Sequence, residues 1–388
     1  MSSKLKIFFA VVVTFVLTAS AGLYLLGQQQ SGRLYRLEAV ANIIDSRYIG
    51  EYDRESAEDA AISAYVAAIG DPYAAYYDKS SSESFQNTVK GNYVGIGIEV
   101  YDNLAGDIVV LAAYNGSPAK RAGIRSGDVI TAIDGVSYGA ENMTDAVLIM
   151  KGANIENPVG TELTLTVRRG DETLDIAVTR EEIDLYIIES SVVGDGILYL
   201  RYTGFSAESA DKLEKLLDGA DETYKGVILD LRENPGGDLD AAVDVCDLFL
   251  DDGLIMYTEN KSGNRIEMSA REGSCKLPLA VLVNEGSASA SEVVAGCIQA
   301  RERGLIIGEK TYGKGVSQMI FKLGLDDDSE MVKVTSYKNY RPDGIWLDEA
   351  VTPDIEAGSK IEIDEYGNVT FGEPDEALMK AIEEISKR

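Results

Sequence analysis

Three continuous apolar runs, each ending in a glycine-containing loop, constrain the fold of this chain more than any other feature. They are Gly226–Leu231, Leu279–Val283 and Gly304–Glu309. Continuous rather than alternating apolar residues are typical of strands buried on both faces. Helix-forming stretches follow the first two runs, and strands that alternate with helices favour an α/β fold with an at least partly parallel sheet.

Between about residues 91 and 178 the pattern changes to short strand-like runs bounded by Gly, Asn or Asp. Within this region the loop of Val94, Gly95, Ile96 and Gly97 leads into an apolar strand. The backbone N–H groups of such a loop can hold a terminal carboxylate, and the edge strand can accept an extended peptide. For a G-x-G pattern taken alone, a hairpin or a bulge is the alternative.

The stretch Ser117–Gly135 strongly resembles the central part of PDZ domains. It contains the S-P-A, A-G-I and G-D-x-I-x-x-I-D-G elements in order. The resemblance implies an inserted β-rich PDZ domain whose loop Val94–Gly97 binds the C-terminal end of a peptide.

Ser289 stands in the loop after the second apolar run, directly before a helix of small residues. A strand, a tight turn and a helix can present a nucleophilic serine, because N–H groups at the helix start stabilise an oxyanion. The alternative is a capping box, in which Ser289 and Glu292 only cap the helix.

A nucleophilic serine needs a base, and the chain contains no histidine. Ser-His-Asp catalysis is therefore excluded, which leaves a carboxylate or a lysine with a lowered pKa. Lys314, between two glycines, is the best placed candidate. On an extended segment Gln318 lies on the same face as Lys314 and could orient its amine.

Four segments in order resemble the carboxyl-terminal processing proteases, also called tail-specific proteases. They are Asp230–Gly237, Asn284–Glu292, Gly308–Gln318 and Val351–Ile355. The resemblance covers about residues 31–388, including the PDZ-like region. It implies an α/β protease core with an inserted PDZ-like domain and an N-terminal helical arm.

Carried over to this chain, the resemblance makes Ser289 the nucleophile, Lys314 the general base and Gln318 the residue that positions the lysine. It places the oxyanion hole at the backbone N–H groups of Gly236 and Ala290. Gly237 is a less favoured alternative to Gly236, and Ser287 and Ser291 are interpreted as cap and packing groups.

The activity implied is that of a serine endopeptidase that cuts proteins near their C-termini through an acyl-enzyme. The PDZ domain would recognise apolar C-terminal tails and gate the activity, and no metal or organic cofactor is required. Two other classes of function stay open. The chain could be a binding scaffold that uses only its PDZ groove, or an esterase that uses the same serine and lysine.

The N-terminal stretch Ile7–Leu26 carries no charge and is long enough to span the ~30 Å hydrocarbon layer. Lys4 and Lys6 precede it, so the positive-inside rule places the N-terminus in the cytoplasm and the catalytic part outside. The expected location is the cell membrane, with a single span. Because Ala19-Ser20-Ala21 resembles a signal peptidase site, secretion after cleavage is the alternative.

The net charge of −29 argues against a nucleic-acid partner, since an acidic surface repels phosphate backbones. The expected partners are protein or peptide substrates, the membrane and, by the family resemblance, a second copy of the chain. Three widely spaced cysteines suggest neither a disulfide framework nor a zinc site.

Apolar residues at helical spacing predict a pair of helices between Leu34 and Ala68, broken near Gly50, and a final helix from Asp375 to Lys387. The intervening Asp71-Pro72-Tyr73 is interpreted as turn and cap residues. The predicted divisions are an anchor or signal segment (1–30), a helical arm (31–90), the PDZ domain (91–178), the Ser-Lys protease core (179–360) and a C-terminal strand and helix tail (361–388).

Overall fold

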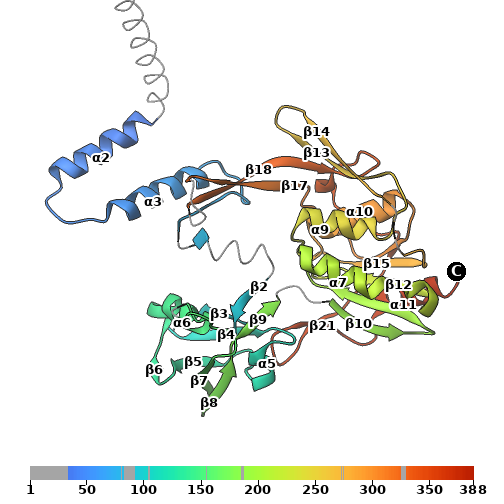
Figure 1. Ribbon diagram of the computed structural model, residues 1–388, viewed down its shortest axis with the longest axis horizontal. Helices are drawn as coiled ribbons and strands as arrows, with labels where there is room; N and C mark the ends of the chain where they lie inside the picture. Colours follow the sequence, from blue (N-terminus) through green and yellow to red (C-terminus); the bar gives the residue numbers. More distant parts are fainter. Residues whose placement is uncertain are drawn as a thin grey trace, which may run out of the picture. The chain divides into compact units, whose positions relative to one another are not determined.

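The structure, a computed structural model, describes residues 34–79, 81–82, 92–103, 105–153, 155–184, 188–271, 273, 275–324 and 329–388. The chain divides between residues 62 and 63 into two compact units, and each is described by itself. Helix α2 (Tyr35–Arg47) and the first part of α3 (Arg54–Ala67) belong to the first unit (Figure 1). The helical pair predicted on either side of Gly50 is therefore confirmed.

The central sheet of the second unit contains, in spatial order, β10 (Ile188–Val193), β11 (Ile197–Tyr202), β12 (Gly226–Asp230), β15 (Leu279–Val283), β16 (Leu305–Gly308) and β19 (Ile355–Glu356). β10 runs antiparallel to β11, and all other neighbours are parallel. The predicted α/β fold class with a partly parallel sheet is confirmed.

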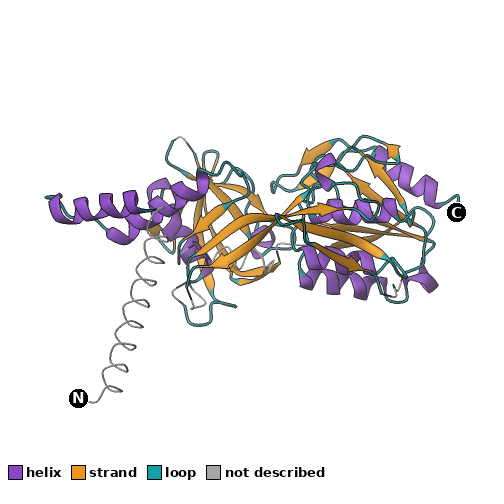
Figure 2. Ribbon diagram, turned by 90° about the horizontal axis from the view of Figure 1, so that it is seen from above, coloured by secondary structure: helices purple, strands orange, loops and turns teal. Residues whose placement is uncertain are grey.

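Helices lie on both faces of this sheet (Figure 2). They are α7 (Ala207–Leu217), α9 (Leu239–Asp247) and α10 (Ala290–Ala300) on one face, with the short α8 (Ala220–Thr223), and α11 (Glu376–Ile385) on the other. Val227 and Leu229 of β12 belong to the core of the first face, and Ile228 packs with α11. Burial on both sides explains why β12 and β15 read as continuous apolar runs.

A second, antiparallel sheet consists of β1 (Ala75–Tyr77), β13 (Leu254–Asn260), β14 (Arg265–Ser269), β17 (Val316–Lys322) and β18 (Met331–Tyr340). β18 pairs with β1, β13 and β17. The β1–β18 pairing sets Ala75 opposite Lys333. This pairing brings the segment before β1 next to β18, a strand that follows the third predicted apolar run in the sequence.

The PDZ-like domain has a sheet ordered β3 (Ile98–Asp102), β4 (Ile108–Ala113), β5 (Val129–Ile133), β7 (Glu162–Arg169) and β8 (Glu172–Thr179), with β6 (Val136–Ser137) paired to β5. Helices α5 (Pro118–Ala122) and α6 (Met143–Lys151) and the 3-10 turn η1 (Ala140–Asn142) complete it. Its core is a separate apolar cluster, as expected for an inserted domain.

Two small antiparallel pairs flank the PDZ-like domain: β2 (Asn92–Gly95) with β9 (Glu181–Asp184), and β20 (Ile361–Ile363) with β21 (Val369–Phe371). A 3-10 turn, η2 (Leu347–Glu349), lies between β18 and β19. The β20–β21 hairpin contacts the PDZ-like domain, where Asn368 Nδ2 donates to the Ala113 carbonyl. It also contacts the main core, where Arg201 donates to the Val369 carbonyl.

Candidate active site

Ser289 lies between β15 and α10, where a parallel strand ends and the helix begins. Its φ is 57°, a left-handed value that a non-glycine residue adopts only at a cost on the order of 1–3 kcal/mol. The side chain is half-buried. This backbone turn lifts the serine out of the core at the start of α10, as the strand–turn–helix pattern predicts.

The neighbouring serines are buried and already bonded. Ser287 Oγ donates to the Leu231 carbonyl at 2.7 Å, and Ser291 Oγ donates to the Asn234 carbonyl at 2.8 Å. Both bonds tie the Ser289 loop to the loop that follows β12. The interpretation of Ser287 and Ser291 as packing groups fits this geometry.

Gly236 approaches Ser289 so closely that a Cβ on it would lie 2.8 Å from Ser289 Cβ and 2.9 Å from the Ala290 nitrogen. The N–H of Gly236 donates to Asn234 Oδ1 at 2.9 Å. Gly237, with φ 142°, has no hydrogen-bond acceptor for its N–H among the described residues. Ala290 is the first residue of α10, where backbone donors lack intrahelical partners.

Glu292 holds the two predicted catalytic segments together through a buried carboxylate. Its Oε2 accepts the N–H of Ser289 and the N–H of Lys314, each at 2.8 Å. Its Oε1 accepts the Thr311 hydroxyl and the Gly313 N–H, each at 2.6 Å. The capping role predicted for Glu292 is therefore present, and it extends to the lysine loop.

Lys314 is half-buried, and its Nζ lies 4.6 Å from the centroid of the Tyr73 ring. Burial lowers the pKa of Lys314 below its usual value, and the charge of Lys333 lowers it further, while Glu292 and Asp71 oppose the shift. Among the described residues no hydrogen bond joins Lys314 Nζ to Ser289 Oγ. The Lys314 amine therefore loses its proton more readily than an exposed lysine does, and its Nζ is not hydrogen-bonded to the Ser289 hydroxyl.

Gln318, predicted to orient the lysine, donates from Nε2 to Thr335 Oγ1 at 3.1 Å. Thr335 in turn hydrogen-bonds Asp71, whose carboxylate also accepts the Tyr73 N–H at 2.9 Å. Burial alone would raise the pKa of Asp71, yet these hydrogen bonds keep it below its usual value. Gln318 thus reaches the surroundings of Lys314 through a Thr335–Asp71 network.

Asp71 and Tyr73 are the members of the site that the sequence reading missed. The turn predicted at Asp71-Pro72-Tyr73 is present, but both side chains also face the lysine. The aromatic residue next to Asp-Pro was the one available sign of a role beyond a turn. The local pattern does not indicate a contact with Lys314, which is distant in the sequence.

The loop that carries Gly236 rests on a buried ion pair network. Arg232 pairs with Asp230 at 2.5 Å and with Asp375, the N-cap of α11, at 2.8 Å. Its guanidinium also stacks 3.7 Å from the centroid of Phe371 in β21. The C-terminal segments therefore support the loop that carries Gly236.

The predicted peptide-binding loop is divided between two elements. Val94 and Gly95 belong to β2 and pair with β9, whereas Ile96 and Gly97 form the connection to the edge strand β3. Gly97, at φ 75°, lies so near Ser117 that a Cβ on it would come within 2.4 Å of Ser117 Cβ.

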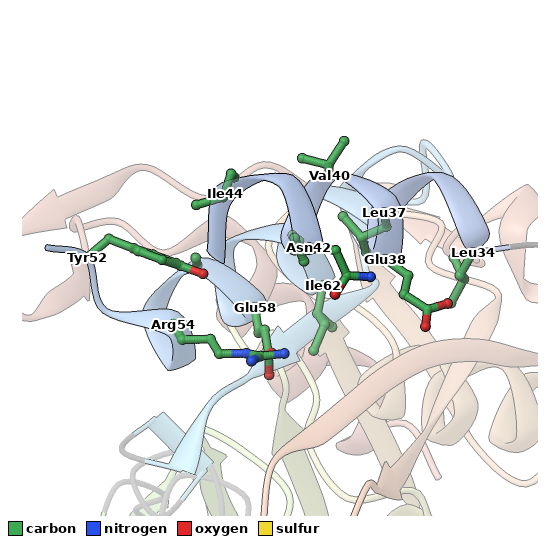
Figure 3. A pocket seen from close by; sticks show the side chains of 13 residues that line it. Leu34, Leu37, Glu38, Val40, Asn42, Ile44, Tyr52, Arg54, Glu58 and Ile62 are labelled. Carbon is green, nitrogen blue, oxygen red and sulfur yellow. The ribbon is translucent and has the colours of Figure 1, made fainter. Parts of the chain in front are cut away.

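A cavity of about 610 Å³ lies between α2 and α3 (Figure 3). Leu37, Val40 and Ile44 of α2 and Ile62 of α3 line it, together with the polar Glu58.

Within the part of the chain that the structure covers, no group of three Cys, Asp or Glu side chains is placed to hold a metal ion. All three cysteines are buried and free.

Comparison with known proteins finds matches to two families. Residues 196–357 match peptidase family S41, and residues 109–169 match the PDZ domain. The chain is 31% identical to the carboxy-terminal processing protease CtpA of Bacillus subtilis, covering 97% of this chain and 81% of that protein. It is 34% identical to a probable CtpA-like serine protease of Staphylococcus aureus (strain COL), covering 89% and 70%.

Among solved structures, the photosystem II D1 C-terminal processing protease superposes with a TM-score of 0.51 at 25% identity. The match covers 84% of this chain and 88% of that one.

Proposed function

This chain belongs to the carboxy-terminal processing proteases of peptidase family S41, and from that premise we propose that Ser289 and Lys314 form its catalytic dyad. The family makes the chain a serine-type peptidase. The observation that supports the two residues is the buried Glu292 carboxylate, which binds the backbone N–H of both at 2.8 Å. A carboxylate that serves only as a helix cap would not also fix a lysine loop.

In the proposed reaction neutral Lys314 takes the proton from Ser289 Oγ as the oxygen attacks the peptide carbonyl. The tetrahedral intermediate collapses, the C–N bond breaks, and Lys314 gives its proton to the leaving amine. Water then attacks the acyl ester and loses its proton to Lys314, which returns it to Ser289 Oγ. N–H groups of Ala290 and of the Gly236–Gly237 turn would bind the oxyanion, and Gly236 must release Asn234 Oδ1 to do so.

The test is cleavage by the full chain of an unfolded reporter protein that ends in three apolar residues. Ser289→Ala and Lys314→Met should each abolish cleavage, while Lys310→Met, an exposed lysine in the same loop, should retain it. The wild-type rate should rise with pH through a pKa below that of an ordinary lysine, because only the neutral amine is a base. Cleavage by Ser289→Ala or by Lys314→Met would refute the dyad.

The PDZ domain is proposed to recognise the apolar C-terminal tail of the substrate and to gate the protease. The β20–β21 hairpin offers the route. In the turn of the hairpin, the Tyr366 carbonyl accepts a hydrogen bond from the Ala113 N–H of the PDZ domain at 2.8 Å. Asp364 of the hairpin pairs with Lys120 of the PDZ domain at 3.3 Å. The other end of the hairpin reaches Arg232 through Phe371. Deleting residues 91–178 should change the cleavage rate. A rate that the deletion leaves unchanged, on short and on long substrates, would contradict gating.

We also propose that the chain is anchored in the cell membrane with its catalytic part outside. The predicted anchor Ile7–Leu26 lies outside the described residues, and no helix in the part that is described is long and apolar enough to span a bilayer. Fractionation of cells that express the full chain, followed by protease digestion from the outer side, tests this. Recovery of a shortened chain in the medium would favour cleavage near Ala21 instead.

The helical arm is proposed to pair with a second copy of the chain. No residue of α2 is buried, and Leu37, Val40 and Ile43 are all about half exposed. Apolar residues on one helix face are normally covered. Light scattering of the full chain should give twice the monomer mass, and Ile43→Glu should reduce it to the monomer. A monomeric wild type would refute the proposal.

A further inference from the structure

Tyr73 places an aromatic ring beside the proposed base, and the proposed reaction does not use it. Its ring faces Lys314 Nζ at 4.6 Å, within the range in which an ammonium is attracted to an aromatic face. The ring comes from the segment before β1, whereas the lysine follows β16. Two parts of the chain separated by the whole PDZ domain thus meet at this amine.

The ring is held in place on several sides. Its own N–H donates to Asp71 Oδ1, and Asp71 is bonded to Thr335 of β18. Its hydroxyl shares a hydrogen bond with Tyr312 in the lysine loop. Two residues further on, Ala75 pairs with Lys333 of β18. Tyr73 is therefore fixed in the active-site wall.

The attraction between an ammonium and an aromatic face acts on the cation only, because it arises from the positive charge over the ring quadrupole. A neutral amine gains little from the ring. The protonated lysine therefore prefers Tyr73, and the neutral lysine, which the reaction requires, is free to reach Ser289 Oγ. The absence of a Lys314–Ser289 hydrogen bond in the described structure fits the first of these states.

We propose that Tyr73 is a positioning residue that holds the protonated form of Lys314 away from Ser289 and releases it on deprotonation. This inference rests on the proposed Ser289–Lys314 dyad. It makes the segment before the PDZ domain part of the active site.

Several other groups also affect the pKa of the Lys314 amine, in addition to the Tyr73 ring. Glu292 from α10 and Asp71 favour the ammonium, while burial and Lys333 from β18 disfavour it. Tyr312 and Asp348 face Tyr73 itself. Because none of these groups is altered by a substitution at position 73, the contribution of the ring can be isolated.

The experiment is the pH profile of kcat/KM for the full chain, from pH 6 to 11, on the reporter with the apolar tail. Tyr73→Leu keeps an apolar group but removes the π face, so it should move the midpoint down by about 0.5–1 pH unit. Well below the midpoint, kcat/KM should then exceed that of wild type by about 3–10-fold, since one unit is a factor of ten in neutral amine.

Three further variants control the result. Tyr73→Phe keeps the ring and should restore the wild-type midpoint, and Tyr73→Trp, with the strongest π face, should raise it. Tyr65→Leu removes a tyrosine that is 69% exposed on α3 and should leave the profile unchanged. If Tyr73→Leu does not fold, the other two variants still test the proposal. A higher midpoint in Tyr73→Trp than in Tyr73→Phe supports it, and one common midpoint contradicts it.

The inference is overturned if Tyr73→Leu lowers kcat/KM by the same factor at every pH, or if Phe, Leu and Trp give one midpoint. Failure of the dyad looks different, because Lys314→Met would then still cleave the reporter. A shift that follows the series Leu, Phe, Trp supports the proposal.

Discussion

At the scale of single residues, the site depends on one carboxylate that accepts four hydrogen bonds. Glu292 fixes the strained turn at Ser289 and the loop at Lys314 with two oxygens, and it is completely buried. All four partners are donors, so the group must be an acceptor throughout. A glutamine of equal size cannot meet this requirement.

Glu292→Gln should therefore abolish most of the activity and destabilise the fold. Its amide NH₂ would face two N–H or O–H donors, and each buried donor left unpaired costs about 1–3 kcal/mol. Cleavage should fall at least about 100-fold, which corresponds to roughly 2.7 kcal/mol. Chemical denaturation should show a loss of about 2–6 kcal/mol. Glu285→Gln, an exposed carboxylate in the same loop, is the matched control. Near-normal activity in Glu292→Gln would contradict the structural role.

Lys314→Met should stabilise the protein while inactivating it. The folded-state pKa of Lys314 is lowered, so between that value and the unfolded one the unfolded chain binds more protons, and stability rises with pH. The cost of burying the ammonium is fully present below the folded pKa and is lost as the pH approaches the unfolded value. The gain in melting temperature should thus be larger at pH 7 than at pH 10.5. An equal gain at both pH values would argue against buried charge as its cause.

At the scale of elements, the sequence predicted the sheet and its helices because each pattern is local. The apolar runs became β12 and β15, and the serine motif lies at the start of α10. What local patterns could not give is which distant segments meet. β1 has three residues, and it finds β18 across more than 250 positions, so Asp71 and Tyr73 could only be read as a turn. Nor could local patterns show that Gln318 donates to Thr335, because this hydrogen bond joins two different strands.

Asp375 joins α11 to the loop that carries Gly236. Among the residues outside the site, we expect a substitution there to lower the stability of the fold the most. Asp375 caps α11 by accepting the Leu378 N–H, and it pairs with buried Arg232. Asp375→Ala should cost about 3–5 kcal/mol, because a buried guanidinium loses one of its two carboxylates. Glu376→Ala, in the next position, should change stability by less than about 1 kcal/mol. Urea denaturation of the two variants measures the difference, and comparable losses would contradict the role of the pair.

At the scale of the whole molecule, the β20–β21 hairpin connects the PDZ domain to the catalytic core. Gly367, at its turn, lies against β4 so closely that a Cβ would come within 2.3 Å of the Leu111 carbonyl. Arg201 donates to the Val369 carbonyl at 2.9 Å on the core side. A change in the PDZ domain thus has a continuous path of contacts toward Arg232.

Gly367→Ala should uncouple the PDZ domain from the protease. The methyl group must push the hairpin from β4, whereas Gly160→Ala introduces the same left-handed strain, at φ 82° against 83°, with no atom within 4 Å. Cleavage of a short peptide that lacks a tail should respond to added tail peptide in wild type and in Gly160→Ala. It should respond much less in Gly367→Ala. A full response in that variant would exclude the hairpin as the route.

The pairing of Arg232 with Asp375 also bears on the order in which a newly made chain can assemble this part of the fold. Ribosomes deliver Arg232 and the Ser289 loop well before residue 375, and during that interval the guanidinium lacks one of its two carboxylates. An emerging chain therefore carries Ser289 before the Gly236 turn has its full support. We expect this turn to take its final conformation only once synthesis has passed Asp375.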